Sequence, residues 1–430
     1  MAQSNPKNEF PLEIETLSYG PYGIGRLEGR VIMIPATAPG DTVRARIVEA
    51  KENYAVGEMI ALVEPSAKRQ TPPCQYFDRC GGCSWQHVRY DVQLQAKQRS
   101  VDDALRRIGK IAGYELRPII PSPRQFRYRR RIRLQSDKNR RLGFYRALSH
   151  EPIEIDSCLI ADEQADLQIG NLRRWVGELD TVIEQVEIVA GDEPGELVVM
   201  AATGESDFNP RDASVCNRLL TGQPAVSGVI IMGRGWRRTF GQPKISIRTE
   251  SDIRLQVEAD VFTQVNREGN QEILQALLRA GEFNGSDRVL ELYCGAGNFT
   301  VSVAKRVREV VAVEAHRAAI DSGKLSAQLN DVENIRWKCA HVPAALKELG
   351  RRGERFTKII LDPPRAGAKG IDRDLASLDA RKIFYISCNP ATLARDLSAL
   401  AIQGYKLRMV QPVDLFPHTF HVETLAELIH

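Results

Sequence analysis

The chain has 430 residues, of which 43% are hydrophobic and 27% charged, the composition of an ordinary soluble protein with room for two or three domains. Its net charge of +4 excludes a strongly basic chain, and no apolar run reaches the roughly 20 residues that a membrane helix needs. The first ten residues also lack the apolar centre of a secretory signal. The sequence therefore predicts a cytoplasmic enzyme with no membrane partner.

Short strands separated by turns are predicted near the N-terminus. Residues 17–26 are punctuated by glycine, residues 31–35 and 42–48 are strand-like, and residues 39–41 (Pro-Gly-Asp) form a turn between two strands. We expect residues 1–70 to form a small β-barrel. Such a barrel is too short to be an enzyme and is suited to an accessory binding role.

Three of the eight cysteines, Cys74, Cys80 and Cys83, lie close together in the sequence. A cytosolic protein of this size has no need of disulfides, so clustered thiols indicate metal binding or catalysis. Together with a fourth cysteine from elsewhere in the chain, these thiolates would fit either a zinc ion or an iron–sulfur cluster. The residue pattern alone leaves the choice between these two open.

A basic segment follows a helix that is predicted over residues 91–108. Residues 124–146 carry ten lysines or arginines against one acid, Asp137, with four aromatic residues among them. Such a segment can neutralise phosphates while its aromatic faces stack on unpaired bases, which indicates RNA binding. A solvated charged hairpin is the alternative. A half-buried strand is expected over residues 127–134, and residues 125–250 are predicted to be mostly β.

Strands and helices alternate in the C-terminal part of the chain. Helices are expected over residues 271–280 and 391–400, and strands over residues 288–292, 309–313, 334–339, 358–362 and 382–387. This alternation is typical of a doubly wound α/β domain. In such sheets ligands bind at the ends of the strands, so polar residues at those positions are candidates for a site.

A glycine turn between the first strand and the next helix is a candidate cofactor loop. Gly295 and Gly297 let the backbone approach a ligand where Cβ atoms would clash. Thr300 occupies the position of the third glycine in a dinucleotide-binding loop, and Glu314 ends the next strand, where a carboxylate can accept both ribose hydroxyls. These two details favour a methyltransferase over a dinucleotide enzyme or a plain helix-capping turn.

Three further residues are candidates for the same cleft. His341 follows the third strand, where an adenine would lie, and it either faces the adenine or caps a loop. Asp362 stands at a strand end, where the two prolines that follow it can hold it over the cleft. Gln264 carries an amide that donates and accepts in one plane, as an imide edge or a cofactor requires.

Cys388 is the candidate nucleophile, because it lies between a strand and a helix. Asn389 is a good N-cap and Pro390 a good first helical residue. Cys388 is thus predicted at a helix N-terminus, where the dipole favours the thiolate; a buried structural cysteine is the alternative.

A thiol is suited to the methylation of uracil. Its addition to C6 makes C5 nucleophilic toward the methyl sulfonium of S-adenosylmethionine (SAM), and a base must then remove the C5 proton before the thiol is eliminated. Glu423, His418 and His421 are candidates for that base, and the chemistry of the sequence alone does not choose between them.

These motifs together resemble the TrmA/RlmD family of RNA 5-methyluridine methyltransferases. The matching motifs are Phe262-x-Gln264-x-Asn266, Tyr293-Cys-Gly-Ala-Gly-Asn-Phe299, Val313-Glu314, Asp362-Pro-Pro-Arg365, Ser387-Cys-Asn-Pro390 and His421-Val-Glu423. The resemblance implies a Rossmann-like domain that uses SAM, with Cys388 as nucleophile and Glu423 as base. The residues that it places around SAM are Gln264, Tyr293, Asn298, Glu314 and Asp362. At His341 the chain departs from the family, which more often has an acid or an amide there.

The resemblance extends to the N-terminal half. Cys74, Cys80, Cys83 and Cys158 resemble the family's [4Fe–4S] ligand set, and the barrel resembles a TRAM domain, an RNA-binding accessory module. Both features indicate the RlmD branch, which methylates uracil C5 in 23S ribosomal RNA, since the shorter tRNA enzymes have neither. A tRNA 5-methyluridine methyltransferase is the alternative within the family, and an RNA-binding protein without catalysis is the alternative from another class.

Three domains are expected in a monomer. Residues 1–70 form the TRAM-like barrel, residues 71–255 a mostly β central domain with the cluster and an RNA-binding surface, and residues 256–430 the SAM-dependent methyltransferase domain. In the RlmD branch the helical stretch of residues 93–120 packs on the catalytic domain, which would make the central domain discontinuous.

Overall fold

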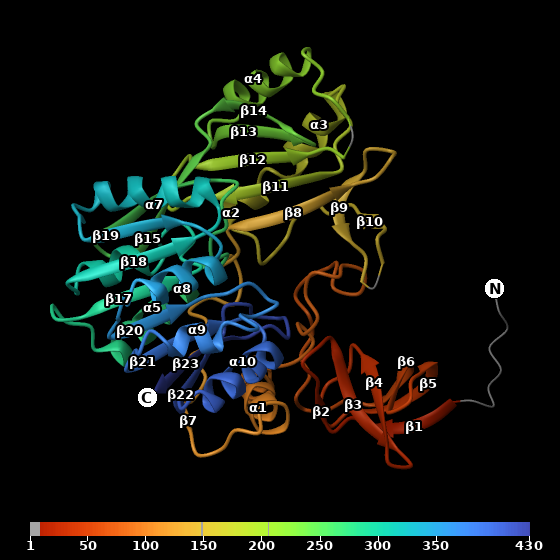
Figure 1. Cartoon of the computed structure of the whole chain (residues 1–430). Coiled ribbons are helices and arrows are strands. Elements are labelled where there is room, and N and C mark those ends of the chain that lie inside the picture. Colours follow the sequence, from red (N-terminus) through yellow and green to blue (C-terminus); the bar gives the residue numbers. More distant parts are fainter. Residues whose placement is uncertain (1–8, 148, 205) are drawn as a thin grey trace.

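The computed structural model describes residues 9–147, 149–204 and 206–430, which form three large β-sheets and a two-stranded one (Figure 1). The first eight residues, on which most of the expected absence of a secretory signal rests, lie outside this description. No helix within the described ranges is long and apolar enough to cross a membrane.

The N-terminal sheet, red in Figure 1, has six strands in the order β1-β5-β6-β4-β3-β2. The strands are β1 (Glu9–Glu13), β2 (Thr16–Leu17), β3 (Tyr22–Leu27), β4 (Arg30–Pro35), β5 (Thr42–Ala50) and β6 (Tyr54–Glu64). Alternate side chains point inward, so that Ile32, Ile34 and Val43 are part of a small core. Gly25 is required beside this core, because a Cβ there would stand 2.4 Å from the Glu13 carbonyl oxygen.

The second sheet has seven strands in the order β10-β9-β8-β11-β12-β13-β14. These are β8 (Arg131–Ser136), β9 (Leu142–Tyr145), β10 (Pro152–Ile153), β11 (Gln185–Ala190), β12 (Leu197–Ala202), β13 (Val226–Gly233) and β14 (Trp236–Gly241). Three helices that the sequence reading did not predict belong to this part: α2 (Glu163–Asp166), α3 (Ile169–Glu178) and α4 (Asp212–Gly222). The apolar faces of α3 and α4 share one core with the sheet.

The third sheet has eight strands in the order β19-β18-β17-β20-β21-β23-β22-β7. These are β7 (Glu115–Leu116), β17 (Arg288–Leu292), β18 (Glu309–Glu314), β19 (Ile335–Cys339), β20 (Lys358–Leu361), β21 (Lys382–Ser387), β22 (Lys406–Val413) and β23 (Glu423–Ile429). Strands β17 to β21 run parallel to one another, and β23 runs antiparallel to both β21 and β22. The strand order reverses between β17 and β20, which is the position where open α/β sheets bind ligands.

Helices cover both faces of the third sheet, as expected for a doubly wound domain. They are α5 (Arg267–Gly281), α6 (Thr300–Ala304), α7 (Arg317–Leu329), α8 (Val342–Arg351), α9 (Asp372–Ala376) and α10 (Pro390–Ile402). Residues of α5 to α7 share one apolar core with the sheet, and residues of α8 to α10 share a second. A hairpin of β15 (Lys244–Glu250) and β16 (Ile253–Glu258) adds to the first core.

Helix α1 (Tyr90–Arg107) precedes the second sheet in the chain but packs on the third. Its Val101 and Leu105 lie in the same core as Leu393 of α10, and β7, which follows α1, extends the sheet beside β22. Lys97 of α1 forms a fully buried ion pair with Asp414, with 2.5 Å between Nζ and Oδ1. The segment that contains α1 and β7 is therefore built into the α/β unit.

Replacement of Lys97 by methionine is expected to destabilise the protein strongly. The variant keeps most of the side-chain volume but leaves Asp414 buried without its counter-charge, and breaking a buried pair in this way costs about 3–5 kcal/mol. Denaturant titration should show this loss in the free energy of unfolding. Lys406→Met, at an exposed position of β22, should change it by less than about 0.5 kcal/mol; equal values for the two variants would contradict the prediction.

The barrel packs against a surface formed by separate segments of the chain. One apolar cluster joins Leu17 and Ala38 of the barrel to Trp85, Val88 and Val92, with Phe420 packed against it. Arg99 of α1 donates a hydrogen bond to Thr16 Oγ1 at 3.1 Å, and β2 lies beside α1 in Figure 1. The edge of the barrel that carries β2 therefore adjoins the segment that leads into β23.

Candidate active site

Three ionisable groups meet at one edge of the third sheet. Asp362 follows β20, Cys388 follows β21, and Glu423 opens β23. Strands β21 and β23 are paired with Ser387 opposite Thr424, so Cys388 and Glu423 are the next residues at that edge. Burial raises the pKa of the Cys388 thiol, and negative charge on Glu423 and on Asp362 adds to the rise, so the three groups lie within electrostatic reach of one another.

The position of Cys388 follows from the local sequence. The Asn389 side chain accepts hydrogen bonds from the backbone N–H groups of Ala391 at 3.0 Å and Thr392 at 3.4 Å, and α10 begins at Pro390. This is the cap that the sequence predicts. It holds the half-buried thiol of Cys388 at the N-terminus of the helix.

The protonation of this site differs from the sequence expectation of a favoured thiolate. Burial raises the pKa of Cys388 to about 11, and Glu423 and Asp362 add to the shift while Arg365 opposes it. Burial also raises the pKa of Asp362 to about 7 and that of Glu423 well above its ordinary value. Desolvation and nearby carboxyl groups therefore disfavour the thiolate of Cys388, in opposition to the effect expected of the helix N-terminus.

The two histidines that were candidate bases occupy different environments. His418 is fully buried and stacks on Phe126 with 4.5 Å between the ring centroids, and its Nδ1 lies 3.3 Å from Nε2 of Gln93. His421 is half-buried, with its ring centroid 4.2 Å from that of Phe420. Burial lowers the pKa of each histidine to about 4. Both are neutral at physiological pH, and His418 is held by packing.

The turn after β17 lies at the same edge of the sheet as Asp362, because β17 and β20 are parallel neighbours. Tyr293, Gly295 and Gly297 have positive φ values of 62°, 54° and 89°, a region that glycine adopts freely. A Cβ at Gly295 would meet no atom within 4 Å, so open space lies over this turn. Glu314, at the end of β18, accepts the Gly295 N–H at 3.2 Å. The backbone approach and the carboxylate expected for a nucleoside cofactor are thus both present.

The other predicted cofactor residues differ in their burial and in their hydrogen bonds. Asn298 exchanges two 2.8 Å hydrogen bonds with Asn270 of α5. Gln264 is half-buried in the loop between β16 and α5. His341 is exposed at the N-cap position of α8, and its side chain makes no capping hydrogen bond. The loop-capping alternative for His341 is therefore not what the structure shows.

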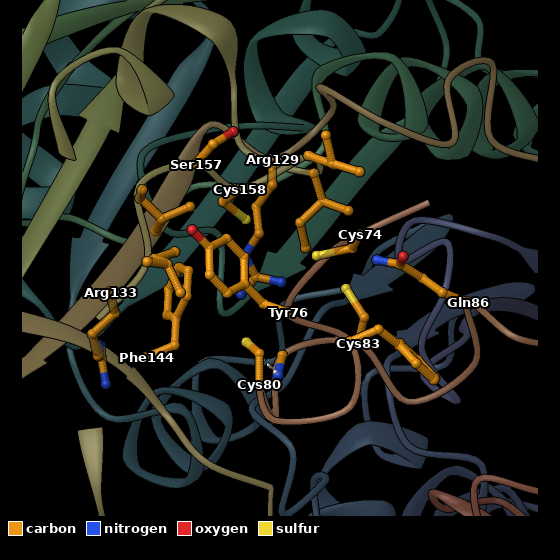
Figure 2. Close-up of a pocket in the computed structure, with 16 residues that line it drawn as sticks. Cys74, Tyr76, Cys80, Cys83, Gln86, Arg129, Arg133, Phe144, Ser157 and Cys158 are labelled. Atoms are coloured by element: carbon orange, nitrogen blue, oxygen red, sulfur yellow. Dashed lines mark hydrogen bonds between the residues drawn. The ribbon is translucent and has the colours of Figure 1, made fainter. Parts of the chain in front are cut away.

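The four cysteines of the predicted ligand set line one cavity of about 190 Å³ (Figure 2). Burial raises the pKa of Cys83 to about 12 and that of Cys158 to about 11, and other thiols of the set add to both shifts. Over the described part of the chain, however, no three Cys, His, Asp or Glu side chains form a group that could hold one metal ion. The four thiols surround a space and do not meet at a point.

Asp166 organises one side of the cysteine cavity. Its carboxylate accepts the backbone N–H of Cys158 at 2.5 Å, the Ser157 hydroxyl at 3.0 Å and the Arg127 guanidinium at 2.6 Å. On the other side, the Gly82 N–H donates to Cys80 Sγ at 3.4 Å. Both cysteine loops therefore make hydrogen bonds with neighbouring groups of the protein.

Most arginines of the basic segment form ion pairs with acidic residues of the same chain. Arg127 pairs with Asp166, Arg130 with Asp192, Arg131 and Arg133 with Glu187, Arg141 with Asp137, and Arg146 with Glu151. The strand expected over residues 127–134 begins only at Arg131, since Arg127 has a φ of 56°. The segment is thus neither a fully solvated hairpin nor a continuous cationic surface.

Two residues near Cys388 were not singled out from the sequence. The Tyr19 hydroxyl, in the barrel, donates a hydrogen bond to the Cys388 carbonyl oxygen at 2.9 Å. Burial raises the pKa of both Cys388 and Glu423, and the positive charge of Arg365 opposes this rise. Arg365 could have been found, because it is the cation of a strand-end motif. Tyr19 could not, since its contact depends on how the barrel docks.

A doubly wound sheet with a glycine turn at its switch point and a nearby carboxylate is an arrangement that binds nucleoside cofactors. A family model described as tRNA (Uracil-5-)-methyltransferase matches residues 237–429, and a TRAM domain model matches residues 3–60. The chain is 31% identical to an uncharacterized RNA methyltransferase of Halalkalibacterium halodurans, over 99% of this chain and 98% of that protein. It is 32% identical to the 23S rRNA (uracil(1939)-C(5))-methyltransferase RlmD of Mannheimia succiniciproducens, over 98% and 96%.

The chain belongs to the TrmA/RlmD family of RNA 5-methyluridine methyltransferases. The solved structure of the Pyrococcus abyssi tRNA (uracil-54, C5)-methyltransferase in complex with S-adenosyl-L-homocysteine is similar, with a TM-score of 0.75 and 25% identity over 98% of this chain and 100% of that one. The predictions of a SAM methyltransferase fold and an N-terminal TRAM domain are confirmed, and the activity is SAM-dependent methylation of uracil C5 in RNA. The domain limits and the roles of individual site residues stay predictions.

Proposed function

We propose that this enzyme methylates C5 of a uracil in 23S ribosomal RNA, with Cys388 as nucleophile and Glu423 as the base that removes the C5 proton. The pairing of β21 with β23 carries the mechanism, because it puts a thiol and a carboxyl group at the same edge of the sheet. The substrate rests on the RlmD relative, which is similar over 98% of this chain. That similarity includes both the barrel and the cysteine segment.

Each bond change in the reaction has a candidate residue. The Cys388 thiol releases its proton as its sulfur bonds to uracil C6, and the electrons of the C5–C6 double bond move toward O4, which makes C5 nucleophilic. The Gly295 turn and Glu314 would hold SAM, which would supply the methyl group from its sulfonium and leave as a neutral thioether. Glu423 accepts the C5 proton, the C5–C6 double bond forms again, and the sulfur–C6 bond breaks to return the Cys388 thiolate.

The proposed cofactor contacts follow the same geometry. Glu314 stands at the edge of the open space over Gly295, where its carboxylate would accept ribose hydroxyls. Asn298, whose amide is held by Asn270, and Tyr293 belong to the same turn. Asp362 and Gln264 would complete the set, and the sequence proposal for His341 stays a prediction.

RNA transcripts separate the two candidate substrates. We expect the purified enzyme to transfer tritiated methyl groups from SAM to a 23S ribosomal RNA transcript and not to tRNA transcripts above background. Mass spectrometry of the nucleosides should show 5-methyluridine. The alternative substrate is tRNA, and it rests on the similarity to the Pyrococcus abyssi tRNA enzyme. Methylation of tRNA alone would replace the proposed substrate and leave the roles of Cys388 and Glu423 unchanged.

We also propose that Cys74, Cys80, Cys83 and Cys158 hold a [4Fe–4S] cluster. A zinc ion draws its thiolates to about 2.3 Å from one point, whereas a cluster places four irons between them. The four thiols of this chain surround a cavity of about 190 Å³, and the described residues contain no group that could hold a single ion. Four thiolates are the donor set of either group, and the choice of iron rests on the resemblance of these cysteines to the family's [4Fe–4S] ligands.

Protein purified without oxygen is expected to be brown and to contain iron and inorganic sulfide in equal amounts. Cys83→Ser should lower both contents sharply, because it removes one of four thiolate ligands. Cys339→Ser changes an exposed cysteine that does not line the cavity, and it should retain the wild-type content. Colourless wild-type protein with one zinc per chain would refute the assignment of iron.

A further inference from the structure

Tyr19 brings the barrel into contact with the catalytic turn. It lies in the turn between β2 and β3, which is closed by a 2.9 Å hydrogen bond from the Ser18 N–H to the Tyr22 carbonyl oxygen. Its hydroxyl donates to the Cys388 carbonyl oxygen at 2.9 Å. Its ring meets Phe420 edge to face, with 5.6 Å between centroids and an angle of 84°. A single side chain thus touches both segments that carry the proposed catalytic groups.

The hydrogen bond from Tyr19 restrains the carbonyl oxygen of the proposed nucleophile itself. The Cys388 carbonyl belongs to the peptide group between the nucleophile and the helix cap Asn389. Its orientation is coupled to the backbone angles of Cys388, which set the direction of the thiol. On the other side of this peptide, the Asn389 N–H is held by Ser387 Oγ at 3.2 Å. Tyr19 therefore restrains the turn from outside the α/β unit.

The ring contact extends this restraint toward the base. Phe420 lies three residues before Glu423 and packs on the apolar cluster that joins the barrel to the α/β unit. The same docking surface includes the hydrogen bond from Arg99 to Thr16, next to β2. The docked barrel thus determines the position of Tyr19. Tyr19 in turn contacts the turn that follows β21 and the segment that precedes β23.

We propose that Tyr19 is a positioning residue for methylation, which orients the Cys388 turn and makes the docked barrel part of the active site. This inference rests on the proposed role of Cys388 as nucleophile. The barrel then has two functions: it contributes to RNA binding as a TRAM domain, and it sets the geometry of the thiol that attacks the bound uracil. The restraint on the Cys388 turn operates through the hydroxyl, so it can be removed while the ring contact with Phe420 is kept.

The full-length Tyr19→Phe variant tests this role. It keeps the ring against Phe420 and removes the hydrogen bond, so kcat and the single-turnover rate of covalent capture by 5-fluorouridine RNA should fall about tenfold, the factor carried by one hydrogen bond. KM for RNA and the melting temperature should stay at wild-type values. Tyr22→Phe removes a hydroxyl from the half-buried tyrosine on β3 of the same barrel and should leave all four quantities unchanged.

Three results for Tyr19→Phe would overturn the inference. The first is a wild-type rate of capture, and the second is a raised KM with unchanged kcat, which would make Tyr19 an RNA contact. The third is a lowered melting temperature that by itself accounts for the loss of activity. Wild type and Cys388→Ala are assayed in parallel. If wild type forms no adduct, or Cys388→Ala still forms one, the proposed function fails. If both behave as proposed and Tyr19→Phe equals wild type, only the role of Tyr19 fails.

Discussion

Replacing Cys388 by alanine is expected to abolish methylation of RNA. Without the thiol no group adds to uracil C6, C5 stays unreactive, and turnover should fall by about 10⁴-fold or more, as when other covalent nucleophiles are removed. Incorporation of labelled methyl groups measures this loss. Cys216→Ala, a buried cysteine of the second sheet's core, should retain activity and controls for the change from cysteine to alanine.

Covalent capture adds a second measurement of the same variant. With 5-fluorouridine RNA the wild type should form a complex that survives denaturing electrophoresis, because fluorine cannot be removed as a proton and the sulfur–C6 bond persists. Cys388→Ala should form none. Wild-type methylation by Cys388→Ala would return this residue to a structural role.

Replacing Glu423 by glutamine is expected to stop the reaction after methyl transfer. The amide has nearly the same shape but cannot accept the C5 proton, so the enzyme should accumulate a covalent adduct with ordinary uridine RNA while turnover falls by about 10²–10⁴-fold. Gel electrophoresis under denaturing conditions detects the adduct. Mass spectrometry of the isolated complex should show the methyl group already present.

His421→Asn distinguishes the rival base. His421 is half-buried near the same edge, and burial keeps its pKa at about 4, so its replacement should not trap RNA. Accumulation of adduct in His421→Asn but not in Glu423→Gln would transfer the role of base to the histidine. His418 is a poorer rival, because it is fully buried against Phe126.

The elements that the sequence predicts well are those with a local signal. The helix expected over residues 391–400 is α10 (Pro390–Ile402), since the cap and the proline stand together. Helix α5 begins at Arg267, before the expected residue 271, because Asn266 accepts the Gly269 N–H and caps it. Asn266 had been interpreted only as part of a family motif, although it is also an ordinary N-cap.

Helix α3 was missed although its signal is present. Ile169, Leu172, Trp175 and Val176 are buried at helical spacing. Strand-like runs on both sides of this segment make the whole region resemble β structure. A short amphipathic helix beside strong strands is easily overlooked, because its 3.6-residue spacing is visible only in a sequence window that matches the helix.

Some features of the candidate site can likewise be predicted from the sequence, whereas others depend on the fold. Asp362 and Cys388 could be placed together in advance, since parallel strands bring their carboxyl ends to one edge. The raised pKa values of Cys388 and Glu423 could not, because they depend on burial and on the mutual distance of three acids. Nor could the internal pairing of arginines such as Arg130, which is 2% exposed. A charge run in a sequence does not reveal how many of its members face solvent.

The built-in position of α1 and β7 has a consequence for the order of events during synthesis. Strand β7 is made early, yet its partner β22 lies about 290 residues further along the chain. At 5–20 residues per second the ribosome needs on the order of 15–60 s to supply that partner. Until then Lys97 has no Asp414, and α1 carries an uncovered apolar face. The nascent chain can complete its barrel long before it can close the sheet on which the barrel will dock.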